Sequence, residues 1–120
     1  MYKHLSLESL RNLEIIDPGL AVQMMNVFLA EFPQHVQNIQ KFISAENGPD
    51  LGRRVHALKG SISIFGCTEI CKSLKEIELL AKDLKIKEAI SKYKTDKKNI
   101  DDFVGEIQSY LMAESNKSAA

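Results

Sequence analysis

Between Arg53 and Gly66, apolar residues recur in steps of three and four, and this spacing constrains the fold more than any other feature of the chain. At 3.6 residues per turn, such steps place side chains on one face of an α-helix. A second face carries a histidine, a lysine and two glycines. Glycine inside a helix costs roughly 1 kcal/mol relative to alanine, so two glycines beside one histidine indicate close approach by a backbone or a bulky group. The apolar set is Val55, Leu58, Ile62 and Phe65, and the second set is Gly52, His56, Lys59, Gly60 and Ser63.

Helical spacing also dominates the chain before this stretch. Leucines at positions 5, 7, 10 and 13 predict a short N-terminal helix that ends at Ile16-Asp17-Pro18-Gly19. We expect Asp17 to cap the next helix, with Pro18 at its first position. That helix continues to about Glu46, and Pro33 inside it predicts a kink or a brief break. Its apolar residues are Leu20, Met24, Val27, Phe28, Phe32, Val36, Ile39 and Ile43.

Turn residues separate three further helices. Gly48 suits a left-handed C-terminal cap and Asp50 suits the next helix start, so the histidine helix is expected from about Asp50 to Phe65, ending at Gly66. Thr68 is expected to cap the following helix, with Glu69 in its first turn. The polar middle of the last helix, 94–99, predicts a solvated or broken segment. The inner face expected for the helix after Gly66 is Ile70, Leu74, Ile77, Leu80, Ala81 and Leu84.

These elements predict an all-α fold. Short loops between successive helices favour an up-down antiparallel four-helix bundle with a short extra N-terminal helix. At 120 residues the chain is long enough for one domain with its own core. We expect that domain to span residues 1–113 and the small polar tail, 114–120, to be disordered. The sequence shows no internal repeat and no strand-like alternation.

Composition excludes several classes of function. Sixteen Lys and Arg balance sixteen Asp and Glu, whereas a general nucleic-acid binder carries an excess of basic residues. No apolar run approaches the ~18 residues that span a bilayer. The first residues also lack the hydrophobic core of a secretion signal, so we expect a cytoplasmic protein without membrane contact. Cys67 and Cys71 complete no zinc pattern and are expected to be reduced, semi-buried thiols.

His56-Ala57-Leu58-Lys59-Gly60-Ser61, followed by Gly66, resembles the signature of histidine-containing phosphotransfer (HPt) domains. The basic pair Arg53-Arg54, the chain length and the apolar pattern from about Leu5 to Leu111 extend the resemblance over nearly the whole chain. Ile62 departs from the family pattern, in which a small residue is common. Because Ile62 falls on the apolar face, we expect the change to affect packing rather than chemistry.

The resemblance implies a phosphorelay intermediate of two-component systems. Such a protein accepts a phosphoryl group on His56 from a receiver-domain phospho-aspartate and passes it to another receiver domain. It is a phosphoprotein and a carrier rather than an enzyme. The chain has no Walker motif, no glycine-rich phosphate loop and no acidic metal cluster, so we expect no ATP site, no cofactor and no metal of its own. Mg²⁺ is expected on the partner receiver.

Elementary chemistry gives the site residues their roles. Imidazole titrates near neutral pH, and its neutral form has a lone pair that can attack a phosphoryl group. Lys59 can supply charge for the transferring oxygens, and Gly60 keeps the next turn low for a partner's loops. In the family a Glu or Gln often sits beside the histidine at about the spacing of Glu78. If Glu78 accepts a hydrogen bond from one ring nitrogen of His56, the other nitrogen is the nucleophile.

The remaining polar residues are expected either to contact a partner or to have ordinary structural roles. Lys82, one turn after Glu78, adds charge to the same surface, and we expect Gly52, Arg53, Ser63 and Lys82 to contact a receiver domain. The protein is expected to act as a monomer. His4 and His35 are expected to be surface or hydrogen-bonded core histidines, and Pro33 argues against a metal pair of Glu31 with His35.

One alternative stays open. The chain could be a non-catalytic helical adaptor that binds receiver domains or partner helices, although an adaptor has no need of His56, Lys59 and Gly60 together. A metal-binding bundle enzyme would need inward-facing carboxylates and histidines, for which the apolar faces leave no room. The sequence leaves open the pathway, the receivers, the direction of phosphoryl flow, and whether the domain stands alone or belongs to a hybrid kinase.

Overall fold

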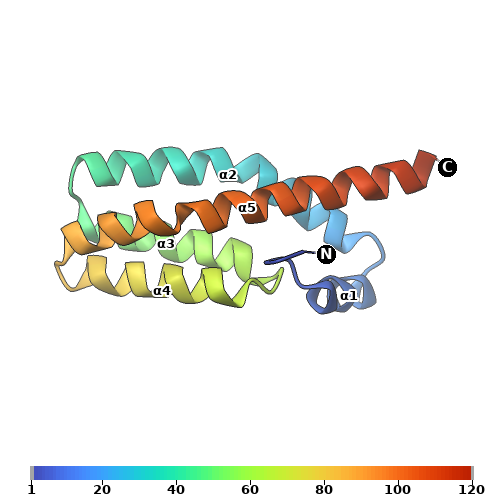
Figure 1. Cartoon of the computed structure of the whole chain (residues 1–120), viewed down its shortest axis with the longest axis horizontal. Coiled ribbons are helices and arrows are strands. Elements are labelled where there is room, and N and C mark those ends of the chain that lie inside the picture. Colours follow the sequence, from blue (N-terminus) through green and yellow to red (C-terminus); the bar gives the residue numbers. More distant parts are fainter. Residues whose placement is uncertain (1, 120) are drawn as a thin grey trace.

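The computed structural model describes residues 2–119, and these residues form five helices with no strand (Figure 1). Helices α2 to α5 run up and down beside one another and form the bundle, and the short helix α1 lies at one end. This confirms the predicted all-α, up-down four-helix bundle with an extra N-terminal helix. The helices are α1 (Leu7–Ile16), α2 (Leu20–Ser44), α3 (Gly48–Ser63), α4 (Thr68–Lys82) and α5 (Ile86–Ala119).

The core lies inside a closed ring of four helices. Helix α3 packs against α2 and α4, and α5 packs against α4 and α2. Three aromatic rings meet at its centre, where the rings of Phe28, Phe65 and Phe103 have centroids 5.5 to 6.1 Å apart. Ile62 is fully buried, as expected for a residue of the apolar face. A packed core of this kind holds α3 rigidly, so its outer face presents side chains from a fixed platform.

The histidine helix α3 begins earlier than predicted. Asn47 is its N-cap and accepts a hydrogen bond from the Asp50 backbone N–H, with Pro49 in the first turn. The left-handed residue that ends the preceding helix is Glu46, with φ of 49°, so the prediction that Gly48 fills this position was wrong. Gly48 is instead the first residue of α3 and is buried. The side chain of Asn47 therefore caps the helix, a role that Asp50 was expected to fill.

Helix α2 differs from the prediction at its start, and in its middle it lacks the break that was one of the two predicted alternatives. Its N-cap is Gly19, with φ of 85°, so the expectation that Asp17 caps it with Pro18 at the first position was wrong. Pro33 lies inside one continuous helix from Leu20 to Ser44. Packing against α3 and α5 therefore holds the helix together across the residue that removes a backbone donor.

Two predictions about α4 were wrong. Its N-cap is Cys67, with φ of 38°, and Thr68 is already helical. Leu84, expected on the inner face, has a left-handed φ of 61° just beyond the helix and is 83% exposed. A leucine two residues past the last helical turn no longer follows the helical period, so its side chain leaves the core face.

Helix α5 is unbroken through the polar segment 94–99. The segment is solvated, which is one of the two alternatives that the sequence predicts. The helix also continues through 114–119, which we expected to be disordered; the predicted domain bounds themselves stay a prediction. Figure 1 shows the C-terminal part of α5 extending past the ends of α3 and α4. The bundle proper therefore uses the first part of α5.

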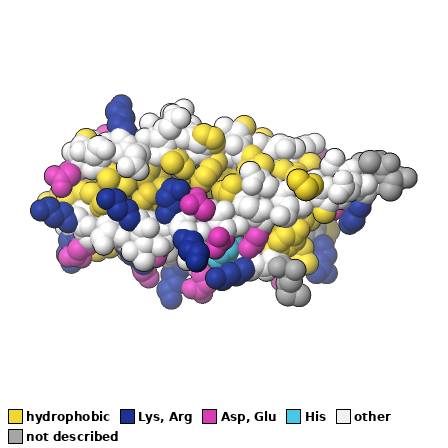
Figure 2. Space-filling model, turned by 45° about the horizontal axis from the view of Figure 1, so that its top comes forward, with side chains coloured by type: hydrophobic (Ala, Val, Ile, Leu, Met, Phe, Trp, Pro, Cys, Tyr) yellow, Lys and Arg dark blue, Asp and Glu magenta, His cyan; other side chains and the backbone are white. Residues whose placement is uncertain are grey.

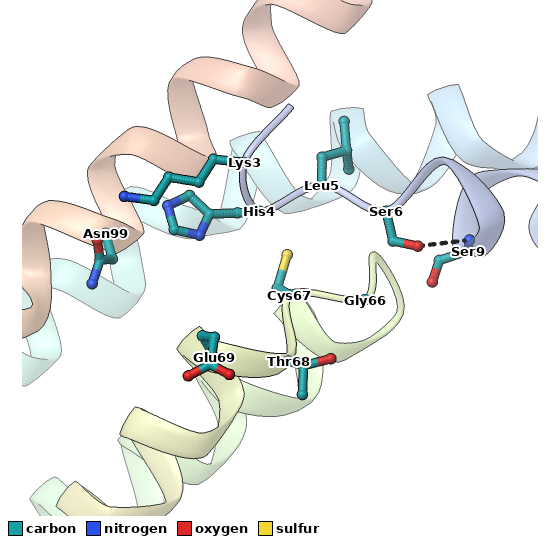
Figure 3. Close-up of a pocket in the computed structure, with 10 residues that line it drawn as sticks. All are labelled: Lys3, His4, Leu5, Ser6, Ser9, Gly66, Cys67, Thr68, Glu69 and Asn99. Carbon is teal, nitrogen blue, oxygen red and sulfur yellow. Dashed lines mark hydrogen bonds between the residues drawn. The ribbon is translucent and has the colours of Figure 1, made fainter. Parts of the chain in front are cut away.

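The segment before α1 ties the turn between α3 and α4 to α5. The carboxylate of Glu106 accepts backbone N–H hydrogen bonds from Lys3, His4 and Leu5 at 2.8 to 3.2 Å. Leu5 is buried and forms an isolated β-bridge with Gly66. Figure 3 shows this end of the molecule, where a cavity of about 620 Å³ opens between the N-terminal segment and the start of α4. These contacts fix the end of α3 that follows the histidine.

Apolar side chains also reach the surface. Figure 2 shows hydrophobic side chains gathered in a band along one face, with lysine, arginine and acidic side chains beside it. Partial exposure of apolar atoms is usual for a small domain. No described helix is by itself long and apolar enough to cross a membrane; α1 and α2 meet that criterion only together, across a bend of 112°.

Candidate functional site

His56 lies on the outer face of α3, in the middle of the helix. Its neighbours Val55 and Leu58 are buried in the core, whereas the His56 side chain is 63% exposed. The apolar face inferred from the sequence therefore anchors the helix in the core, and His56 presents its imidazole ring to solvent. An exposed ring on a rigid helix is accessible to a macromolecular partner.

Glu78 on α4 lies directly beside the ring. Its Oε1 is 3.0 Å from Nδ1 of His56, and its side chain is only 1% exposed. The two residues are twenty-two positions apart, and the antiparallel packing of α3 against α4 brings them together. The predicted contact between Glu78 and His56 is therefore present.

Two lysines also form ion pairs with this carboxylate. Nζ of Lys59 lies 3.3 Å from Oε1, and Nζ of Lys82 lies 2.8 Å from Oε2. Lys59 comes from α3 and Lys82 from α4, so the cluster joins both helices. We call Glu78, His56, Lys59 and Lys82 the Glu78 cluster. Two ammonium groups around one carboxylate leave a net positive charge beside the imidazole.

The cluster keeps Glu78 ionised. Burial alone raises the pKa of a carboxyl group, but hydrogen bonds from Lys82, His56 and Lys59 outweigh burial and lower the pKa of Glu78 to about 2. An ionised carboxylate has no proton to donate, so the hydrogen bond at 3.0 Å requires a proton on Nδ1 of His56. In the neutral ring, the lone pair then belongs to Nε2.

Comparison with known families decides what this arrangement is. The family model described as "Hpt domain" matches residues 23–112, which cover the histidine helix and most of the bundle. The chain belongs to the Hpt domain family. Hpt domains carry out histidine phosphotransfer in phosphorelays and are phosphocarriers rather than enzymes by themselves. They interact with receiver domains of two-component systems. Neither curated proteins nor solved structures gave a match in the same comparisons.

Three of the predicted site residues of this Hpt domain lie on the exposed surface around His56. A β-carbon added at Gly60 would have no atom within 4 Å, so the surface one turn after the histidine is open. Ser63 is exposed and donates its hydroxyl to the carbonyl of Gly60 at 3.0 Å. Arg53 is exposed and forms an ion pair with Asp50. Its guanidinium is thus already partly neutralised.

Gly52 does not lie on that surface. It is buried between α3 and α4, where a β-carbon would lie 3.6 Å from atoms of Glu78, Ala81 and Lys82. The prediction that Gly52 contacts a receiver domain was therefore wrong, because the partner that approaches this glycine is α4 of the same chain. The sequence did indicate a close approach, but not by which element.

An apolar groove beside Gly60 was missed. Val27, one of the apolar residues named for this helix in the sequence, is 49% exposed, and with Met24 and Ile64 it lines a cavity of about 210 Å³ that reaches Gly60 and Ser61. The groove lies between α2 and α3, on the other side of α3 from Glu78. The position of Val27 on the edge of the apolar stripe was the only signal in the sequence.

The remaining histidines and cysteines differ from His56 in burial. His35 is buried, and burial together with the charge of Arg54 lowers its pKa. The half-buried His4 and the buried His35 each have one ring nitrogen without a hydrogen-bond partner in the structure as described. Cys67 and Cys71 are free thiols; Cys71 is half-buried as expected, whereas Cys67 is buried, and burial raises the pKa of Cys67 to about 12. Within residues 2–119, no group of three or more metal-ligating side chains comes together.

Proposed function

We propose that this Hpt domain accepts a phosphoryl group on Nε2 of His56 from a receiver-domain phospho-aspartate and passes it to another receiver domain. One observation carries the proposal: an exposed imidazole whose Nδ1 is bound to a buried, ionised carboxylate held between two lysines. A bundle that only bound partners would need neither the exposed ring nor the buried anion behind it.

The transfer reaction needs no reactant other than the two proteins. The lone pair on Nε2 attacks phosphorus, an N–P bond forms, and the bond from phosphorus to the aspartyl oxygen breaks. The aspartate carboxylate leaves with that electron pair. The proton on Nδ1 stays on the ring, so positive charge develops on the imidazole during the attack. The Glu78 carboxylate, 3.0 Å away, stabilises this charge.

The lysines act on the phosphoryl oxygens. Phosphoryl transfer depends chiefly on positioning and on positive charge around the transferring group. Lys59 is 21% and Lys82 55% exposed, so their ammonium groups can turn from Glu78 towards a phosphoryl group on His56 while remaining near the carboxylate. The further positive charge, Mg²⁺, is expected on the receiver domain, where it holds the phospho-aspartate.

The surface around His56 fits a receiver domain in two ways. The Glu78 cluster presents net positive charge, which favours the anionic active site of a phosphorylated receiver. The groove formed by Met24, Val27 and Ile64 offers apolar contact on the opposite side of the ring. Because nothing would lie near a β-carbon at Gly60, the space between them is free for the partner's active-site loops.

The test is phosphotransfer from a receiver domain labelled with radioactive phosphate. Wild-type protein should take up a label that is acid-labile and base-stable, as expected of phosphohistidine. The His56→Gln variant should take up none while keeping its helical circular dichroism and its unfolding midpoint, because the His56 side chain is mostly solvated. His4→Gln and His35→Gln provide controls and should keep the label.

Label on the His56→Gln variant would contradict the proposal. If the wild-type protein bound a receiver domain with measurable affinity but took up no label from any of a panel of phosphorylated receivers, the chain would be an adaptor. Adding a second, unphosphorylated receiver should remove the label from wild-type protein. Label that stayed on the Hpt domain would contradict the relay step.

A further inference from the structure

Gly52 lies one turn before His56, on the side of α3 that faces α4. It is buried, and a β-carbon at this position would be 3.6 Å from three atoms at once: the carbonyl oxygen of Glu78, Cβ of Ala81 and Cγ of Lys82. Two of these residues belong to the Glu78 cluster. A separation of 3.6 Å is ordinary van der Waals contact, so there is room for one methyl group and nothing larger.

Gly48 makes the approach closer still one turn earlier. A β-carbon there would lie 2.8 Å from the carbonyl oxygen of Ala81, which is closer than real β-carbons come to backbone atoms. Glycine at 48 and 52 and alanine at 81, which is fully buried, thus bring the backbones of α3 and α4 together near Glu78. The separation of the two helices sets how far the Glu78 side chain must reach to meet His56.

We infer that Gly52 is a positioning residue for the phosphotransfer reaction: it fixes the spacing between α3 and α4 at which Glu78 can hold Nδ1 of His56. This inference rests on the proposed function. Gly52 touches neither the phosphoryl group nor the ring. It acts through Glu78, whose carboxylate determines which ring nitrogen carries the proton and which carries the lone pair.

A graded set of substitutions separates spacing from other effects of losing a glycine. Gly52→Ala adds a methyl group that fits. Gly52→Val adds two γ-carbons, and a β-branched residue in a helix has essentially one χ1 rotamer, so these atoms must push α4 away. Gly105→Val on α5 is the matched control, because a β-carbon there meets no atom within 4 Å. Gly48→Ala should also push α4 away from α3, because its β-carbon would meet the carbonyl oxygen of Ala81.

The first readout is the tautomer of His56, measured by long-range ¹H–¹⁵N NMR on the full chain without any partner. Wild type, Gly52→Ala and Gly105→Val should show the proton on Nδ1 in the neutral ring. Gly52→Val should shift the proton population towards Nε2, as expected for a ring released from Glu78. The second readout is the rate of label uptake, which should fall at least about tenfold in Gly52→Val and by less than about twofold in Gly52→Ala.

A folded Gly52→Val protein with the wild-type tautomer and rate would overturn the inference. If Gly52→Val does not fold, Gly48→Ala decides, and an unchanged tautomer in that variant would overturn the inference equally. Failure of the proposed function looks different. In that case wild type would take up no label, while the tautomer of the variants would still report whether Gly52 sets the contact between Glu78 and His56.

Discussion

Two interfaces between helices of the bundle, which we call seams, each contain a carboxylate that pairs with lysine, but the two carboxylates differ in their other partners. Between α3 and α4, Glu78 binds Lys59, Lys82 and the exposed ring of His56. Between α4 and α5, Asp96 binds Lys92, with Nζ 2.9 Å from Oδ2, and accepts a hydrogen bond from the Ser73 hydroxyl. The partners of Asp96 are thus an ammonium group and a hydroxyl group, as in contacts that only stabilise a fold.

The two carboxylates differ most in burial. Glu78 is 1% exposed and Asp96 is 20% exposed. Burying an ionised carboxylate is costly, so a fold keeps one only where several donors satisfy it. Asp96 can exchange its partners for water, whereas Glu78 cannot. The comparison therefore assigns a functional role to the α3–α4 seam and a structural role to the α4–α5 seam, and three predictions test that difference.

The largest expected effect is on stability in acid. The pKa of Glu78 is about 2 in the folded chain against an ordinary value of 4.5, so the stabilisation is complete above pH 4.5 and is lost as the pH falls towards 2. This corresponds to roughly 3 kcal/mol of unfolding free energy. Hydrogen bonds from Ser73 and Lys92 also lower the pKa of Asp96, against the effect of burial, so Asp96 contributes in the same direction.

Denaturant unfolding of wild type, Glu78→Gln and Asp96→Asn over the acid range measures the two contributions. Glu78→Gln should flatten the dependence of stability on pH much more than Asp96→Asn does. Equal slopes for wild type and Glu78→Gln would show that the Glu78 cluster does not hold its carboxylate ionised.

The next effect in size is on phosphotransfer. Glu78→Ala removes the acceptor of the Nδ1 proton and should slow label uptake by about 10- to 100-fold, as expected when the residue that orients a reactive histidine is lost. It should also lower the unfolding free energy by about 2 kcal/mol. Asp96→Ala should cost about 1 kcal/mol or less and leave the transfer rate unchanged.

Glu78→Gln refines this comparison, because the amide oxygen can still accept from Nδ1 although the charge is gone. Its transfer rate should fall between those of wild type and Glu78→Ala. A Glu78→Ala protein that transfers at the wild-type rate would remove Glu78 from the mechanism.

The smallest effect is expected from the lysines. Lys59→Ala and Lys82→Ala should each slow transfer by about tenfold, less than the ~100-fold lost with a fully preorganised donor, because both ammonium groups are partly solvated. Lys92→Ala, which removes the corresponding ammonium from the Asp96 seam, should leave the rate unchanged. Stopped-flow or quench-flow measurement of label uptake distinguishes these cases, and an unchanged rate in Lys59→Ala would exclude a role for that lysine.

Periodicity predicted the fold well because every helix buries an apolar face. The order of the helices, the closed bundle and the burial of Ile62 follow from steps of three and four residues. Helix starts were harder to predict, because several capping residues stand within three positions of one another. At α2 and α4 the chain begins the helix from a left-handed residue, Gly19 or Cys67, without a side-chain cap, and a sequence gives little sign of that.

Most residues of the site and the contact between Glu78 and His56 were predictable, but the division between buried and exposed residues was not. The motif identified His56, Lys59 and Gly60, and the resemblance to HPt domains identified Glu78. Which residues lie in the seam and which lie on the surface depends on how α4 rests against α3. Gly52 and Ser63 share a face of α3 on a helical projection, yet α4 covers only Gly52. The exposure of Val27 likewise depends on where α3 leaves the edge of α2 uncovered.

The central claim is that Glu78 holds the proton on Nδ1 of His56 and leaves Nε2 as the nucleophile. The most direct test is ¹⁵N and ³¹P NMR of the chain after phosphorylation by a receiver domain, with its histidine rings labelled with ¹⁵N. The account predicts phosphorus coupled to Nε2 of His56, with Nδ1 still protonated. Phosphorus on Nδ1 would contradict it, because that nitrogen could not then be bonded to Glu78.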